Sequence, residues 1–177
     1  QISQLTEFAG VPDRVIDIPN GRLTGNMGVE VSPDGSFMFF SRATWSFENN
    51  QVTGIVGSNL MITLWGGNQF VFNANESTRL MDNINSNDLE YAASISSDGL
   101  ELFFTRLVAD SLANGPVRTM IMRSTRTSRT TPFGEPEMIT SIGANDFVEG
   151  PTLTSDEQCL YYHKLDASKM KLYSVCR

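Results

Sequence analysis

One twelve-residue pattern occurs three times in this chain and limits the folds it can adopt more than any other feature. Residues 31–42 read VSPDGSFMFFSR, residues 95–106 read ISSDGLELFFTR, and residues 153–164 read LTSDEQCLYYHK. A period of about 60 residues separates the copies, which indicates that one supersecondary unit is repeated. We expect its aspartates to occupy equivalent turn positions and to accept backbone N–H bonds there; they are Asp34, Asp98 and Asp156.

Each copy predicts a strand, a tight turn and a second strand, because Asp-Gly between alternating apolar residues supplies the left-handed backbone of a short hairpin turn. A third strand is expected after a variable loop, at residues 59–65, 119–125 and 169–175. A weaker fourth strand is expected around Arg79-Leu80-Met81 and around Glu137-Met138-Ile139. Such units are typical of a β-propeller. We therefore expect an all-β fold, one β-propeller module over residues 1–177, built from three four-stranded antiparallel blade units at residues 26–82, 88–140 and 146–177.

The same residues resemble the TolB-type, WD-repeat-like β-propeller repeats of bacterial envelope and secreted proteins. The resemblance rests on Ser-Pro-Asp-Gly before a Phe-Phe or Tyr-Tyr strand, and on Ser124-Thr125-Arg126 leading into Pro-Phe-Gly-Glu-Pro at residues 132–136. It covers nearly the whole chain and departs from the family at Glu157, which replaces the turn glycine. It implies a propeller fold and a periplasmic or secreted location. Such repeats serve as binding platforms and also lie within enzymes.

The order of the pieces leaves both ends of the predicted module open. Residues 8–18 look like an outermost strand without a blade, and the chain stops just after the third strand of the last unit. Because propellers have about 4 to 8 blades, two explanations compete. Either the chain is cut from a longer propeller, or two chains exchange N-terminal strands and each forms half of a six-bladed ring. The matched ends favour the homodimer.

Composition and motifs narrow the expected partners. Lys plus Arg number 13 against 20 Asp plus Glu, and the formal net charge of −7 disfavours nucleic acid. No apolar stretch is long enough for a membrane-spanning helix, so we expect no membrane insertion. No phosphate-binding loop, paired-cysteine zinc pattern or hydrolase elbow is present, and His163 is the single histidine. The sequence therefore predicts no catalytic residue, metal or cofactor, and a protein or carbohydrate ligand.

Carboxylates gather where the inner strands of the predicted blades begin, at the mouth of the expected channel. The predicted ligand-binding carboxylates are Glu30, Asp88, Glu90, Asp146 and Glu149. A ring of such groups would bind a cation, a basic group or sugar hydroxyls. The alternative, which we favour, is that the repeated Asn-Asp pairs cap turns and serve the fold.

The longest variable loop, at residues 43–58, carries Trp45 and Phe47 beside amide side chains. Aromatic and amide groups on an exposed loop suit contact with a carbohydrate or a peptide. The equal alternative is that both rings fold back over the blade. We expect a non-catalytic binding or assembly scaffold that uses the channel-mouth face. The second hypothesis is a carbohydrate-active propeller hydrolase or lyase whose carboxylate pair is Glu90 and Glu149.

The two cysteines lie on either side of a predicted hairpin turn at residues 166–168. Cys159 and Cys176 would then stand level with each other on neighbouring strands. This placement allows a disulfide, which requires an oxidising compartment, and two half-buried thiols are the alternative.

Overall fold

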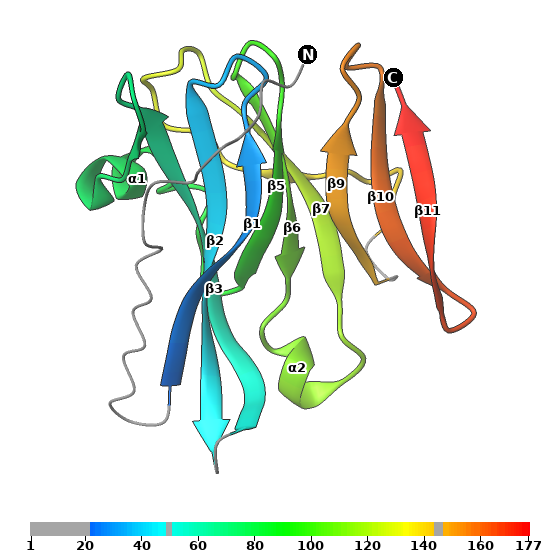
Figure 1. The fold of residues 1–177 in the computed structure, drawn as a ribbon. Helices are drawn as coiled ribbons and strands as arrows, with labels where there is room; N and C mark the ends of the chain where they lie inside the picture. Colours follow the sequence, from blue (N-terminus) through cyan, green and yellow to red (C-terminus); the bar gives the residue numbers. More distant parts are fainter. Residues whose placement is uncertain (1–21, 49–50, 144–146) are drawn as a thin grey trace, which may run out of the picture.

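The computed structural model describes residues 22–48, 51–143 and 147–177, and in these ranges the chain is an all-β protein (Figure 1). Two short helices interrupt the strands, α1 (Ala74–Leu80) and α2 (Ser111–Asn114). Neither of these helices in the described ranges is long and apolar enough to cross a membrane. The all-β part of the sequence prediction is therefore confirmed.

The strands form one mixed sheet of eight strands and one antiparallel sheet of three. They are β1 (Arg22–Val31), β2 (Phe37–Glu48), β3 (Gln51–Trp65), β4 (Phe70–Val71), β5 (Leu89–Ile95), β6 (Glu101–Leu107), β7 (Thr119–Thr125), β8 (Glu137–Met138), β9 (Val148–Leu153), β10 (Cys159–Asp166) and β11 (Lys169–Cys176). The larger sheet has the order β1-β2-β3-β5-β6-β7-β8, with β4 paired to β3. The smaller sheet has the order β11-β10-β9.

The prediction of β-propeller blades is wrong. The first two predicted blades are joined, because β3 pairs in parallel with β5 at Ser58 and Leu89, and together they form one mixed sheet. The third unit has three strands instead of four, and the described ranges form no closed barrel, propeller or half-ring. The repeated pattern specifies hairpins through local turns and alternation, and a local signal does not determine how neighbouring units join. The predicted closing strand, residues 8–18, lies outside the described residues.

The residues predicted as the fourth strand of the first unit form α1 instead. The side chain of Asn73 caps this helix by accepting the N–H of Glu76 at 3.1 Å, and Glu76 pairs with Arg79 at 2.6 Å. A short apolar run does not distinguish a strand from a helix, whereas this capping pattern does. The strand that pairs with β3 is β4, just before the helix. In the second unit the fourth strand predicted near Glu137 is present as β8.

The three repeated aspartates occupy equivalent turns, as predicted. Each accepts the backbone N–H two residues later, at 3.1 Å for Asp34, 2.8 Å for Asp98 and 3.1 Å for Asp156. Each also accepts the hydroxyl two residues earlier, and this contact is the largest cause that lowers the pKa of all three carboxyls. The next residue has positive φ in each turn, as Gly35 and Gly99 show.

The three turns lie at the same end of the molecule, the top of Figure 1, and side chains connect them. Arg129 donates to the backbone oxygen of Asp98 at 2.7 Å and forms an ion pair with Asp34, so it joins the first two turns. Glu157 has the left-handed φ of 58° in the third turn. Its carboxylate accepts both the N–H and the hydroxyl of Ser97 at 2.6 Å, which joins the third turn to the second.

A β-bulge interrupts the first strand of every unit at the same distance from its turn. Positive φ values mark the three bulges, at 60° for Gly28, 53° for Ala92 and 64° for Gly150. Glycine adopts this conformation without steric cost, whereas alanine does not. The second unit therefore holds a strained residue where its neighbours have glycine.

Two hydrophobic cores lie on opposite sides of the second unit. The first core contains Phe39 of β2 and Phe104 of β6, and the second contains Phe103 of β6 with Val148 and Leu160 of the three-stranded sheet. Successive residues of a strand face opposite sides, so β6 contributes to both cores. The second unit is thus shared between them.

Candidate functional site

Glu90, a predicted site carboxylate, is fully buried and serves the fold. One of its oxygens accepts the hydroxyl of Ser86 at 2.6 Å and the Nε of Arg106 at 2.9 Å. Its other oxygen accepts the N–H of Ser86 at 3.2 Å. Arg106 also donates to the backbone oxygen of Ile84 at 2.8 Å, which fixes its guanidinium. A carboxylate held in this way has no open side for a ligand.

Glu30 and Glu149 connect the first strands of the three units. Glu30 accepts the hydroxyl of Ser94 at 3.4 Å, and burial raises its pKa. Ser94 in turn accepts the N–H of Leu153 at 3.1 Å. Glu149 accepts the phenol of Tyr91 at 3.0 Å, and the pKa of Tyr91 is raised by burial and by the neighbouring carboxylate. These contacts favour the interpretation that the carboxylates serve the fold.

Residues 43–58, predicted as a variable loop, mostly continue β2 and β3 as one long hairpin (Figure 1). Trp45 lies in β2, opposite Leu23 on one side and Ile55 on the other. It is half-buried and covers Gly25, where an added Cβ would lie 3.2 Å from the ring. The ring therefore folds back over the neighbouring strand. Two other predicted site residues cannot be placed in this way: Asp146 lies outside the described residues, and so does the side chain of Phe47.

A groove of about 330 Å³ lies between the first three strands and the loop that leads into β5. We call it the β1–β3 groove, and its polar lining includes Thr24, Arg42, Thr44, Asn59, Asn87 and Asp88. Among the predicted site residues that the structure describes, Asp88 alone lines it, and its carboxylate also accepts the N–H of Ala109 at 2.9 Å. Sequence reasoning missed the other residues.

Strand register places the groove residues in two rows. Directly opposite one another across β1, β2 and β3 lie Asn26, Arg42 and Asn59. The neighbouring row contains Thr24, Thr44 and Gly57. Residues two apart on a strand share a face, so both rows lie on the same side of the three strands. A Cβ added to Gly57 would meet no atom within 4 Å, which shows that this part of the groove is open.

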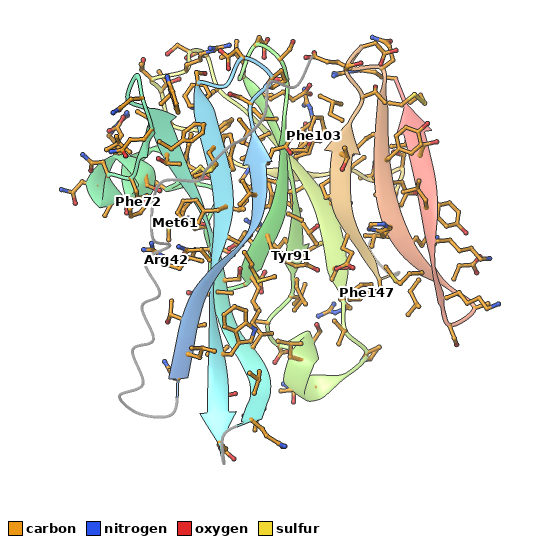
Figure 2. All side chains as sticks on the ribbon, in the orientation of Figure 1. Arg42, Met61, Phe72, Tyr91, Phe103 and Phe147 are labelled. Atoms are coloured by element: carbon orange, nitrogen blue, oxygen red, sulfur yellow. A yellow bond between two sulfur atoms is a disulfide. The ribbon has the colours of Figure 1, made fainter. Side chains whose placement is uncertain are left out.

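Arg42 supplies the positive charge of the groove. Its Nε donates to the Oδ1 of Asn26 at 3.2 Å, and its guanidinium carbon lies 4.9 Å from the ring centre of Phe72 and 5.9 Å from that of Phe40. Figure 2 shows Arg42 beside Met61 and Phe72. Within residues 22–48, 51–143 and 147–177, no carboxylate forms an ion pair with it. Arg42 is thus a half-buried cation in the groove lining that has no ion-pair partner among the described residues.

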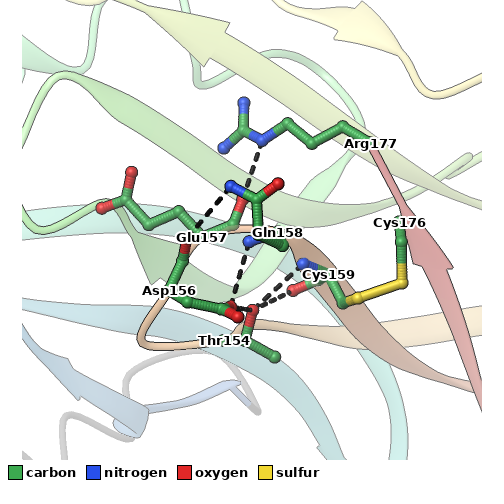
Figure 3. The surroundings of a disulfide bond; sticks show 7 residues. All are labelled: Thr154, Asp156, Glu157, Gln158, Cys159, Cys176 and Arg177. Atoms are coloured by element: carbon green, nitrogen blue, oxygen red, sulfur yellow. Dashed lines mark hydrogen bonds between the residues drawn. A yellow bond between two sulfur atoms is a disulfide. The ribbon is translucent and has the colours of Figure 1, made fainter.

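A second hollow, of about 240 Å³, lies beside a disulfide between the second unit and the three-stranded sheet. Cys159 and Cys176 are directly opposite on β10 and β11 and are bonded, as Figure 3 shows. The disulfide that the sequence allowed is therefore present. Apolar side chains such as Phe103 and Leu160 line this disulfide cavity.

The charges of the disulfide cavity are already paired. Glu101 forms ion pairs with Arg123 and with Arg177, the latter at 2.9 Å. Arg177 also donates to the backbone oxygen of Glu157 at 2.7 Å (Figure 3). These contacts pair the charged groups at the edge of the disulfide cavity with one another, whereas Arg42 in the β1–β3 groove forms no ion pair with a described residue. The groove is therefore the better candidate site.

Comparison with known proteins gives information on the fold alone. No protein-family model matches the sequence, and no curated protein matches it. A puromycin-hydrolyzing peptidase of Mycobacterium tuberculosis has a similar structure, with a TM-score of 0.56 and 16% identity. The match covers 91% of this chain and 23% of the peptidase chain, so this chain spans less than a quarter of the peptidase's length. Sequence identity this low carries no information on activity.

Both carboxylates of the enzymatic hypothesis form hydrogen bonds within the fold. Glu90 is enclosed by Ser86 and Arg106, and Glu149 is bonded to Tyr91. Neither lines the β1–β3 groove or the disulfide cavity. Among the side chains that the structure describes, no group of three or more His, Cys, Asp or Glu is placed to hold a metal ion.

Proposed function

We propose that this chain is a non-catalytic module that binds a carbohydrate in the β1–β3 groove. One observation carries the proposal: Arg42, a guanidinium without an ion-pair partner in the described chain, lies in a groove whose other polar lining groups are hydroxyls, amides and one carboxylate. Such groups complement sugar hydroxyls, which both donate and accept hydrogen bonds. Pockets specific for small ligands use a few polar groups of this kind.

The proposal also includes an oxidising location, periplasmic or secreted. The Cys159–Cys176 disulfide supports it, because disulfides persist mainly outside the reducing cytoplasm.

A saccharide array with matched variants tests this function. We expect the wild-type chain to bind a subset of immobilised oligosaccharides, and Gly57→Val to lose that binding because the new side chain fills open space in the groove. Gly115→Val is the control, since Gly115 also has no atom within 4 Å of an added Cβ and lies near α2, outside the groove. Binding that survives Gly57→Val would contradict the groove as the site. Release of sugar products from a bound oligosaccharide, measured by chromatography, would contradict a non-catalytic role.

A further inference from the structure

The first two units differ at one position that decides whether an arginine is neutralised. In the second unit Arg106 stands opposite Glu90 across β5 and β6, and the two form an ion pair at 2.9 Å. In the first unit Arg42 stands at the equivalent position opposite Asn26 across β1 and β2. Asn26 precedes Asp34 by the same number of residues as Glu90 precedes Asp98. The first unit therefore keeps the cation of the pair and replaces its carboxylate with an amide.

The amide orients Arg42 without cancelling its charge. Asn26 accepts the Nε at 3.2 Å, and the Phe72 ring lies 4.9 Å from the guanidinium carbon. These contacts hold the plane of the guanidinium and leave its two terminal nitrogens without a hydrogen-bond partner in the described part of the chain. The guanidinium fork of an arginine binds a planar carboxylate, like a phosphate, through two parallel N–H bonds.

The rest of the groove favours a saccharide as the bearer of that carboxylate. Thr24, Thr44, Asn59 and Asn87 present hydroxyls and amides, and only two apolar side chains, Val56 and Met61, line it. A sugar ring carries several hydroxyls that these groups can pair with, whereas a peptide terminus offers fewer groups that both donate and accept hydrogen bonds. The volume of about 330 Å³ is at the small end of ligand pockets, so it suits one or two sugar rings.

The charges of the groove also orient the ligand. Asp88 would repel a carboxylate and accept hydroxyls, whereas Arg42 attracts a carboxylate. The chain as a whole carries a formal charge of −7, so an anion is not attracted from a distance. Recognition therefore depends on direct contact with Arg42.

We infer that the ligand of the β1–β3 groove is an acidic saccharide, one with a uronate carboxylate bound to Arg42 and its hydroxyls directed toward Asp88. This inference rests on the proposed function and specifies the ligand class for the same groove. It also assigns Asn26 a role as the residue that keeps Arg42 available.

The experiment measures binding of uronate disaccharides by isothermal titration calorimetry. The probes contain galacturonate, glucuronate or mannuronate, each paired with its carboxyl-reduced neutral counterpart, and a tetrapeptide with a free or amidated C-terminus is included. We expect at least one uronate to bind about 10- to 100-fold more tightly than its neutral counterpart, as loss of a charge-assisted bidentate contact implies.

Three variants locate the contact. Asn26→Glu reproduces the arrangement of Glu90 and Arg106, so it should neutralise Arg42 and lower uronate affinity at least tenfold while preserving the melting temperature. Asn26→Gln changes the same position without adding charge, so the difference in affinity between these two variants isolates the carboxylate. Arg42→Gln should abolish the preference for the uronate over its neutral counterpart.

The outcomes separate the ligand class from the proposed function. Equal affinity for uronate and neutral sugars, lost in Gly57→Val, would overturn the acidic ligand and leave carbohydrate binding intact. Binding of the free-carboxylate peptide alone, dependent on Arg42, would overturn the saccharide. Absence of binding to every probe, together with an empty saccharide array, would overturn both proposals.

Discussion

At the scale of single residues, Ala92 holds a strained backbone conformation at a position where the other two units have glycine. Its φ of 53° is left-handed, at the bulge where the other units have Gly28 and Gly150. We expect Ala92→Gly to raise the free energy of unfolding by about 0.5 kcal/mol, because relief of strain exceeds the added entropy of the unfolded chain. Gly150→Ala should lower it by about 1–3 kcal/mol, since the new Cβ would lie 3.2 Å from the Nδ1 of His163. Urea denaturation measures both, and effects of equal sign would contradict the assignment.

The turn aspartates make stability depend on pH at the same scale. The hydroxyl of Ser96 and the N–H of Leu100 lower the pKa of Asp98, so its contribution is complete above the ordinary pKa near 4 and is lost as the pH falls below that value. We expect Asp98→Ala to cost about 0.5–1.5 kcal/mol at pH 7 and much less near pH 2. Asp82→Ala, at an exposed position, is the control. A cost for Asp98→Ala that is unchanged between pH 7 and pH 2 would exclude the ionised carboxylate as its cause.

At the scale of secondary-structure elements, the disulfide joins the ends of the β10–β11 hairpin. Cys159 and Cys176 are 17 residues apart in sequence, and the paired strands between them already restrict the chain. We therefore expect the double variant Cys159→Ser/Cys176→Ser to lose about 1–3 kcal/mol of unfolding free energy, at or below the range for a free loop of this length. A reducing agent should destabilise the wild type to the same degree and leave the double variant unchanged. Sensitivity of the double variant to reductant would point to another cause.

The elements also show what the sequence predicts well and where it fails. The turns at Asp34 and Asp98 follow from residues within one short segment, so the pattern predicts them. The groove depends on Asn26, Arg42 and Asn59 meeting across three strands, and the bulge at Gly28 sets that register. Arg42 and Arg106, which end the first two copies of the pattern, are evident in the sequence. Their different partners, Asn26 and Glu90, are not. The junction of β3 with β5 likewise has no local signal, which is why the propeller prediction failed.

At the scale of the whole molecule, the shared second unit should make unfolding cooperative. Both tryptophans, Trp45 and Trp65, lie in the first unit, far along the chain from Leu160 in the second core. We expect Leu160→Ala to cost about 2–5 kcal/mol and to lower the melting midpoint equally by tryptophan fluorescence and by far-ultraviolet circular dichroism. A fluorescence midpoint that stays at the wild-type value would show that the three-stranded sheet unfolds on its own.

Hydrogen bonds join the repeated units at their turns and again beside the groove. Arg129 and Glu157 join the turns of the three units at one end of the molecule. The β1–β3 groove is lined by residues of β1, β2 and β3 and by the loop before β5. Asn85 of this loop accepts the N–H of Leu60 in β3 at 2.8 Å and donates to its backbone oxygen at 2.9 Å. Ser58 adds a third bond, to the backbone oxygen of Glu90 at 2.8 Å. The width of the groove is therefore set before a ligand arrives, so a ligand spends no binding energy on closing it.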